Sequence, residues 1–172
     1  MQVIDLSMTI HSDMEVYPGD PQVKIEVLHT YKSHGWKLSN IMMSTHSASH
    51  VDAFSHMHKD MESLDEISLD RFFGRAQLVS KSDVFEKNIG LLFNEDIDLS
   101  LLDKILAASP NFIGGNLSED LEKALLKNKI VTYTNLINLD KLPKNEAFMF
   151  YGLPLKIKDG DGSPVRAIAI ID

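Results

Sequence analysis

Four of the seven histidines of this chain lie within thirteen residues, and this cluster constrains the fold more than any other feature of the sequence. The cluster comprises His46, His50, His56 and His58, with Asp52 among them. Imidazole is the commonest metal ligand in proteins, and a carboxylate is its usual complement. The cluster therefore predicts a metal site, provided that the backbone lets these side chains converge.

Neither a straight strand nor a straight helix brings the side chains together. In an extended strand His46 and His56 would lie about 33 Å apart, because each residue advances the chain by about 3.3 Å. In a helix His46 and His50 share a face, but Asp52 is rotated by about 200° from His50. Residues 47–49 are Ser-Ala-Ser, which are small enough for the backbone to bend around an ion. Two imidazoles and a carboxylate would leave coordination positions open, which is typical of a catalytic metal site.

Two other interpretations of the cluster remain. It could be a solvated polar loop, above all at His58, which lies next to the charged segment 59–62. The pair His50 and Asp52 also fits half of the iron facial triad of oxygenases, but that triad needs a histidine on a later strand, and none follows His58. The remaining histidines, interpreted as ordinary surface or core residues, are His11, His29 and His34.

The overall composition narrows the classes of partner and of site. The chain has 172 residues and a net charge of −8, which suits a single domain, residues 1–172, and makes nucleic acid a poor partner. It contains no cysteine, which excludes a disulfide scaffold, a thiol nucleophile and a Cys-ligated metal site. No apolar run approaches the ~18 residues of a membrane span, and no basic region precedes an apolar stretch at the N-terminus. We therefore expect a cytoplasmic protein without membrane contact.

The patterning of apolar residues predicts a mixed α+β (α/β) domain. Strands are expected at residues 3–8, 23–28, 36–43, 77–80, 112–115, 130–133, 147–151, 153–157 and 165–171, with 36–43 pairing with a half-buried 23–28. Helices are expected at 63–67, 69–73, 99–108 and 119–127, the last capped by Ser118. A turn is expected at 17–21, and a hairpin turn at 159–162 joins the last two strands. Because strands outnumber helices and often follow one another, the sheet is expected to be mixed or mostly antiparallel.

The segment His46–His56, HSASHVDAFSH, resembles the His-x-Gly-Thr-His-x-Asp-x-Pro-x-His signature of the cyclase family, which includes bacterial kynurenine formamidases and isatin hydrolases. All four chemically active positions match. The departures are Ala48, Ser49 and Phe54, which replace the glycine, threonine and proline. Residues 4–7 with 17–21, and 153–157 with 161–167, are similar to the two ends of the family pattern. The resemblance spans nearly the whole chain, although the chain is shorter than typical members.

The resemblance implies a role for each matching residue. His46, His50 and Asp52 would bind a first metal, zinc or manganese, and Asp52 could bridge to a second. His56 would be the general acid/base, and Tyr17 would contact the substrate, with Trp36 as a further stacking residue. The implied fold is a compact mixed, largely antiparallel sheet with flanking helices, a swivelling β/β/α domain. It would assemble as a homodimer or homotetramer.

One departure from the family pattern concerns the second metal. The family places a histidine before a Leu-Leu pair and a glutamate before an Asn-Leu-like segment, and here Glu122 and Thr134 occupy those positions. We therefore expect one ion rather than two, with Glu122 as a further ligand. The implied activity is hydrolysis of a small amide, N-formyl or lactam substrate, with metal-bound water attacking the carbonyl and His56 as acid/base. The alternative is a catalytically silent relative that binds a metal or a small ligand.

Overall fold

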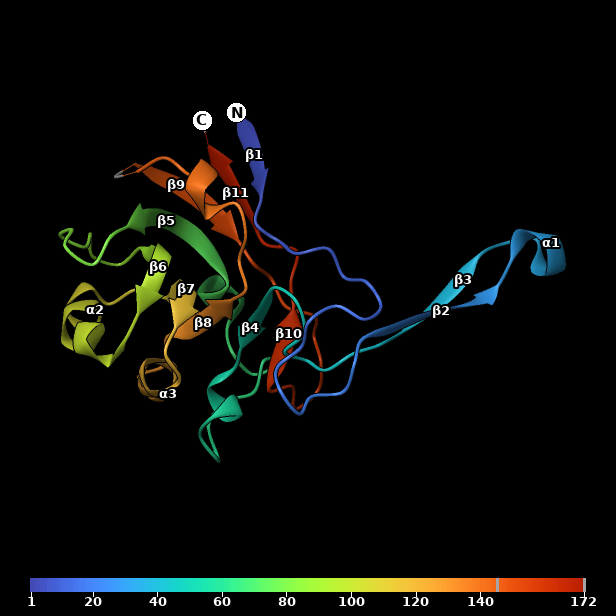
Figure 1. Ribbon diagram of the computed structural model, residues 1–172. Helices are drawn as coiled ribbons and strands as arrows, with labels where there is room; N and C mark the ends of the chain where they lie inside the picture. Colours follow the sequence, from blue (N-terminus) through green and yellow to red (C-terminus); the bar gives the residue numbers. More distant parts are fainter. Residues whose placement is uncertain (145, 172) are drawn as a thin grey trace.

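The computed structural model describes residues 1–144 and 146–171, which centre on a nine-stranded mixed sheet (Figure 1). The strand order is β1-β11-β9-β5-β6-β7-β8-β4-β10. These strands are β1 (Gln2–Asp5), β4 (His50–Asp52), β5 (Phe73–Val79), β6 (Gly90–Ile97), β7 (Phe112–Leu117), β8 (Val131–Thr134), β9 (Ala147–Tyr151), β10 (Gly162–Pro164) and β11 (Ile168–Ile171). A separate hairpin comprises β2 (Lys24–His29), α1 (Tyr31–His34) and β3 (Leu38–Met42). The other helices are α2 (Leu102–Ala108), α3 (Glu119–Lys127) and the short 3-10 helices η1 (Phe54–His56), η2 (Leu69–Arg71), η3 (Leu99–Leu101) and η4 (Leu139–Lys141).

The four central strands of the sheet are parallel to one another, and helical crossovers join three of them. The pairs β5–β6, β6–β7 and β7–β8 are parallel, with an irregular connection between β5 and β6, α2 between β6 and β7, and α3 between β7 and β8. Parallel neighbours need such a crossover, whereas antiparallel neighbours do not. The strands on both flanks pair antiparallel. The predicted mixed α+β class, with a sheet in which antiparallel pairs are the majority, is thereby confirmed.

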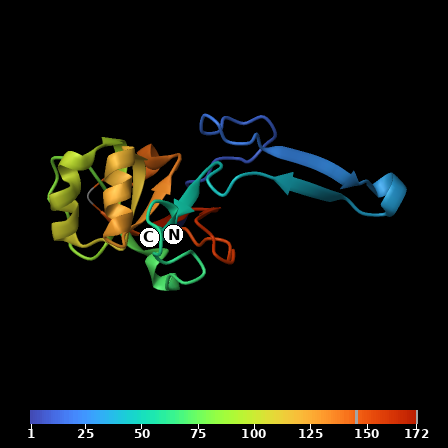
Figure 2. The same cartoon turned by 90° about the horizontal axis from the view of Figure 1, so that it is seen from below.

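Helices α2 and α3 pack together on one face of the sheet, as Figure 2 shows. Ile105 of α2 and Leu121 and Leu125 of α3 are fully buried against Leu91 of β6. The predicted helix at 119–127 is confirmed at both ends, and the hydroxyl of Ser118 accepts a hydrogen bond from the Leu121 N–H at 3.4 Å. No helix among the described residues is long and apolar enough to cross a membrane.

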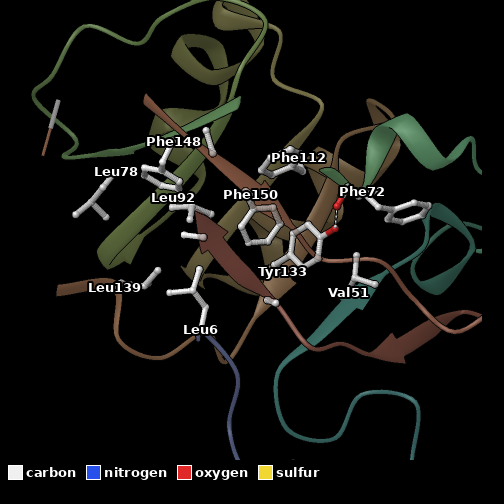
Figure 3. Close-up of a cluster of buried hydrophobic side chains, with 14 of the residues drawn as sticks. Leu6, Val51, Phe72, Leu78, Leu92, Phe112, Tyr133, Leu139, Phe148 and Phe150 are labelled. Atoms are coloured by element: carbon white, nitrogen blue, oxygen red, sulfur yellow. Dashed lines mark hydrogen bonds between the residues drawn. The ribbon is translucent and has the colours of Figure 1, made fainter. Parts of the chain in front are cut away.

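An aromatic core fills the opposite face of the sheet (Figure 3). Tyr133 of β8 packs edge-on against Phe112 and Phe150, and all three rings are buried. The Tyr133 hydroxyl donates to the carbonyls of Gly152 at 2.9 Å and Phe72 at 3.2 Å. A buried hydroxyl is tolerated only with such partners. Because side chains alternate along a strand, Tyr133 in the core directs its neighbours on β8 to the other side.

The prediction of a C-terminal hairpin at residues 153–171 is wrong. Residues 153–157 form no strand; instead the Leu155 N–H donates to the Ser163 hydroxyl at 2.9 Å. Pro154 lacks an N–H and cannot donate to a strand ladder. Residues 162–164 pair with β4 as strand β10, so the turn near Asp159 connects this edge strand to an irregular segment. The end of the predicted strand 165–171 is confirmed as β11.

The helices predicted at 63–67 and 69–73 are also wrong, since the chain there forms turns and the single 3-10 turn η2. The Glu66 carboxylate accepts the Ser63 N–H at 3.0 Å, and the Ser63 hydroxyl donates to Asp65 at 2.8 Å. Such local side-chain bonds compete with helix formation. Strand β6 has no counterpart among the predicted elements. Its buried half, Gly-Leu-Leu-Phe, lacks the alternation expected of a half-buried strand because both faces are covered.

The hairpin of residues 24–42, here called the arm, projects away from the body of the molecule (Figures 1 and 2). Its strands pair antiparallel as predicted, with Ile25 opposite Ile41. The predicted half-burial of residues 23–28 is wrong for most of the strand, since Val27 and Leu28 are each more than half exposed. The arm therefore presents apolar side chains that the chain itself does not cover.

Candidate metal centre

The bend predicted at residues 47–49 is present, and it delivers the chain into β4. Ala48 has a left-handed φ of 56°, and the Ser47 N–H donates to the Ser44 carbonyl at 3.3 Å, which closes a turn. Residues 47–49 are buried. Small side chains suit a turn that is buried in this way.

Alternation along β4 then sets which side chains face the site. Val51 points into the aromatic core, so His50 and Asp52 point to the other side of the strand. His46 returns across the bend, and its Nδ1–H donates to Oδ1 of Asp52 at 2.7 Å. Asp52 is almost fully buried, with 1% of its surface exposed.

His46, Asp52 and His56 form a group whose donor atoms all lie within 4.8 Å of one another. His56 belongs to η1, which follows β4 directly, and its ring lies 3.9 Å from the His46 ring, centroid to centroid. Two imidazole nitrogens and one carboxylate oxygen are donors that suit zinc or manganese. The convergence thus brings together two of the four predicted ligands, His46 and Asp52, with the predicted acid/base His56.

His50, the third predicted ligand, is beside the group but has other partners. Its Nδ1 donates to the carbonyl of Ala48 at 2.8 Å, because a carbonyl only accepts. In the neutral ring Nε2 then accepts from the Thr134 hydroxyl at 2.7 Å. The same Nε2 lies 3.6 Å from Oδ1 of Asp52. A ligand role for His50 stays a prediction, and it would require Nε2 to leave Thr134.

Glu122 of α3 reaches the centre, as its place in the sequence suggested. The Thr132 hydroxyl lies 2.9 Å from Glu122 and 3.1 Å from Asp52, and it bridges the two carboxyl groups. Burial and the adjacent charge of Asp52 raise the pKa of Glu122 to about 8. Burial alone would also raise the pKa of Asp52, but the hydrogen bond from His46 and the charges of His50 and His46 hold it below its usual value. Two carboxyl groups bridged by one hydroxyl, the one of Asp52 buried and the one of Glu122 half-buried, are an arrangement that a bound cation would relieve.

The two remaining imidazoles are shifted in opposite directions. Burial disfavours the charged form of His46, but hydrogen bonds to Asp52 and Asp161 raise its pKa to about 9. Burial and the neighbouring charge of His46 lower the pKa of His56. His56 is therefore mostly neutral at pH 7 and able to accept a proton.

Asp161 is a residue of this centre that the sequence did not reveal. Its Oδ2 accepts a hydrogen bond from Nε2 of His46 at 3.0 Å and lies 3.7 Å from Nδ1 of His56. Asp161 was expected in a hairpin turn between strands, where a carboxylate has no special role. Only the pairing of Gly162 with Asp52 across β10 and β4 places it here.

A cavity of about 1080 Å³ opens over these residues. Tyr17 lines it and is 71% exposed, so it stands at the rim of the cavity. Trp36 lies in the arm, where it contacts the stacked rings of His29 and His34. It does not line the cavity of its own chain. His58 donates to the Lys123 carbonyl at 2.7 Å and takes no part in the group.

A family model matches more than half of this chain, and similar proteins match nearly all of it. The family model called Cyclase matches residues 4–106, which include His46, Asp52 and His56. An uncharacterised protein of Methanocaldococcus jannaschii is 30% identical over 195 positions, covering 99% of this chain and all of that protein.

Two named proteins are also similar. The kynurenine formamidase of Salinibacter ruber is 28% identical over 98% of this chain and 97% of its own length. Isatin hydrolase A from Ralstonia solanacearum shares the fold, with a TM-score of 0.82, 18% identity, and coverage of 99% of this chain and 92% of that one.

Proposed function

Because the chain belongs to the cyclase family, we propose that it is a metal-dependent hydrolase of a small amide, N-formyl or lactam substrate. The observation that carries this proposal is the convergence of His46, Asp52 and His56 beneath an open cavity. The similarity to a kynurenine formamidase and the fold shared with an isatin hydrolase support C–N bond hydrolysis as the reaction class.

The residues present fit a divalent cation, zinc or manganese. His46 and Asp52 would hold it, with His50 and Glu122 as further ligands. The carboxyl groups of Asp52 and Glu122, bridged by the Thr132 hydroxyl, favour a positive charge nearby. One ion is favoured over two, because Thr134, at a position where the family pattern has a glutamate, offers a neutral hydroxyl that is bonded to His50.

The chain's own residues supply the proton transfers and the binding surface. A bound cation would lower the pKa of water and polarise the substrate carbonyl. His56 is neutral enough to accept a proton and lies beside His46 at the cavity, so it can then donate that proton to the departing nitrogen. Tyr17 at the rim presents an aromatic ring against the substrate.

A second candidate function is a catalytically silent relative that binds a metal or small ligand. It is favoured by one observation, that both ring nitrogens of His50 already bind protein groups, the carbonyl of Ala48 and the hydroxyl of Thr134. In that case the centre would bind a cation without turning over substrate.

Turnover of a substrate panel separates the two candidates. We expect protein loaded with zinc or manganese to hydrolyse N-formylkynurenine or a cyclic amide such as isatin, monitored by absorbance. Removal of the metal with a chelator should abolish the activity, and re-addition should restore it, because the ion provides the nucleophile at neutral pH. Metal uptake without any turnover across the panel would establish the silent relative instead.

We further propose that the arm binds a second copy of this chain, giving a homodimer. A lone two-stranded hairpin is at best marginally stable in water, and the arm exposes Tyr31, Trp36 and Ile41 by more than half. The arm carries three lysines and one glutamate, a net charge of +2, so the rest of the chain carries −10 to give the total of −8. Among the described residues the cavity rim offers acidic groups, and no Lys or Arg lines it. A basic apolar arm thus complements the acidic cavity rim of another copy.

The charge of the arm tests this dimer. Reversing Lys32 and Lys37 together to Glu should raise the dimer dissociation constant roughly tenfold or more, since two favourable contacts become repulsive. Light scattering coupled to size-exclusion chromatography measures the mass against the 19.3 kDa of one chain. The matched control reverses two exposed lysines of the body, Lys87 and Lys158. A monomeric unaltered protein, or an arm variant that dimerises as well as the control, would contradict the proposal.

A further inference from the structure

We propose that Asp161 is a positioning residue that fixes the ring of His46 for metal binding. Its carboxylate accepts the Nε2–H of His46, so that Nδ1 of the same ring faces Asp52, the side on which a cation would be held. A histidine ligand that donates its second N–H to a carboxylate is held in one tautomer and one orientation. The inference rests on the proposed function, since it concerns the same centre.

The carboxylate of Asp161 is itself held at two points. Its Oδ1 accepts from the Thr45 hydroxyl at 3.0 Å, while Oδ2 accepts from His46. Its backbone carbonyl accepts from the N–H of Ala53 at 2.8 Å, immediately after β4. Asp161 therefore connects the chain before the bend, at residues 45–46, with the chain after β4.

The neighbouring Gly162 leaves the space that the His46 ring occupies. A Cβ at Gly162 would lie 2.4 Å from Cε1 of His46, a distance that real contacts do not allow. Gly162 is also the residue opposite Asp52 in the pairing of β10 with β4. Asp161 thus provides an acceptor for the His46 imidazole, 115 residues away in the chain, and Gly162 leaves room for that ring.

Asp161 also lies close to the proposed acid/base. Its Oδ2 is 3.7 Å from Nδ1 of His56, too long for a hydrogen bond but close enough for a charge to act. The Asp161 side chain is about half exposed, so its replacement leaves no cavity in the core. Its effects should therefore appear in metal binding and catalysis rather than in folding.

A series of variants at Asp161 tests the inference, with metal affinity as the first measurement. Zinc affinity is measured by competition with a chromogenic chelator, and unfolding is followed by circular dichroism. We expect Asp161→Ala to weaken zinc binding about 10–100-fold, the usual effect of losing a group that supports a metal ligand. Asp161→Asn keeps an acceptor for Nε2–H but loses the charge, so it should fall between Ala and the unaltered protein.

Kinetics and a matched control complete the test. The kcat of Asp161→Ala at saturating zinc should fall while KM for substrate stays within twofold, because the group acts on the metal ligand and not on the substrate. The control is Asp159→Asn, an exposed residue of the same turn whose side chain does not reach the centre. If Asp161→Ala binds zinc as tightly as this control, the inference is overturned while the proposed function stands. If the unaltered protein takes up no zinc or manganese, the proposed function fails and this inference with it.

Discussion

Replacing Asp52 with asparagine is expected to eliminate metal binding and, with it, hydrolysis. Asp52 is the buried carboxylate that His46 contacts at 2.7 Å, and it is the central member of the group of donors. Asparagine has nearly the same shape but no charge, and cations bind a carboxylate far better than an amide. The loss should exceed the about 10–100-fold expected when an outer supporting group is removed.

Metal content and turnover measure this effect together. Elemental analysis of the purified Asp52→Asn protein should find less than a tenth of the zinc or manganese that the unaltered protein holds. Asp70→Asn is the matched control, because Asp70 is exposed in η2 and does not line the cavity. Full metal content in the Asp52→Asn protein would exclude Asp52 as a ligand.

Replacing His56 with alanine is expected to lower kcat by about 10²–10⁴, the usual contribution of a general acid/base. Burial and the charge of His46 keep the His56 ring mostly neutral at pH 7, so it can take a proton and pass it to the leaving nitrogen. The metal content should stay near that of the unaltered protein, because His46 and Asp52 remain.

Steady-state kinetics with metal analysis distinguish the two roles open to His56. A lower kcat at full metal content supports the acid/base role, and added imidazole should restore part of the rate. His58→Ala is the control, since His58 only donates to the Lys123 carbonyl away from the centre. An unchanged rate would remove His56 from the mechanism, and lost metal would make it a ligand.

The centre could be predicted from the sequence because its main members are close along the chain. His46, Asp52 and His56 need only a bend and one strand to converge, and the small residues 47–49 permit that bend. Asp161 could not be predicted in the same way, since it arrives through the pairing of β10 with β4. Local patterns do not report a contact between residues 115 positions apart.

The fold, too, could be predicted where local sequence decides it, and not where distant parts of the chain do. The helix at 119–127 and the strand at 147–151 match their predicted bounds, because a capping serine and a run of apolar and aromatic residues decide them locally. The segment 153–157 has a strand-like pattern, yet its Pro154 and the pairing of β10 with β4 leave it irregular. In this region the sheet's partners, not local propensity, determine the structure.

The most direct test that His46 and Asp52 hold a metal ion is anomalous diffraction from crystals grown with zinc or manganese. We expect one strong peak at about 2.0–2.2 Å from a carboxylate oxygen of Asp52 and from a ring nitrogen of His46. Side chains of these two residues directed into solvent, with no ion between them in metal-soaked crystals, would contradict the assignment of a metal-dependent enzyme.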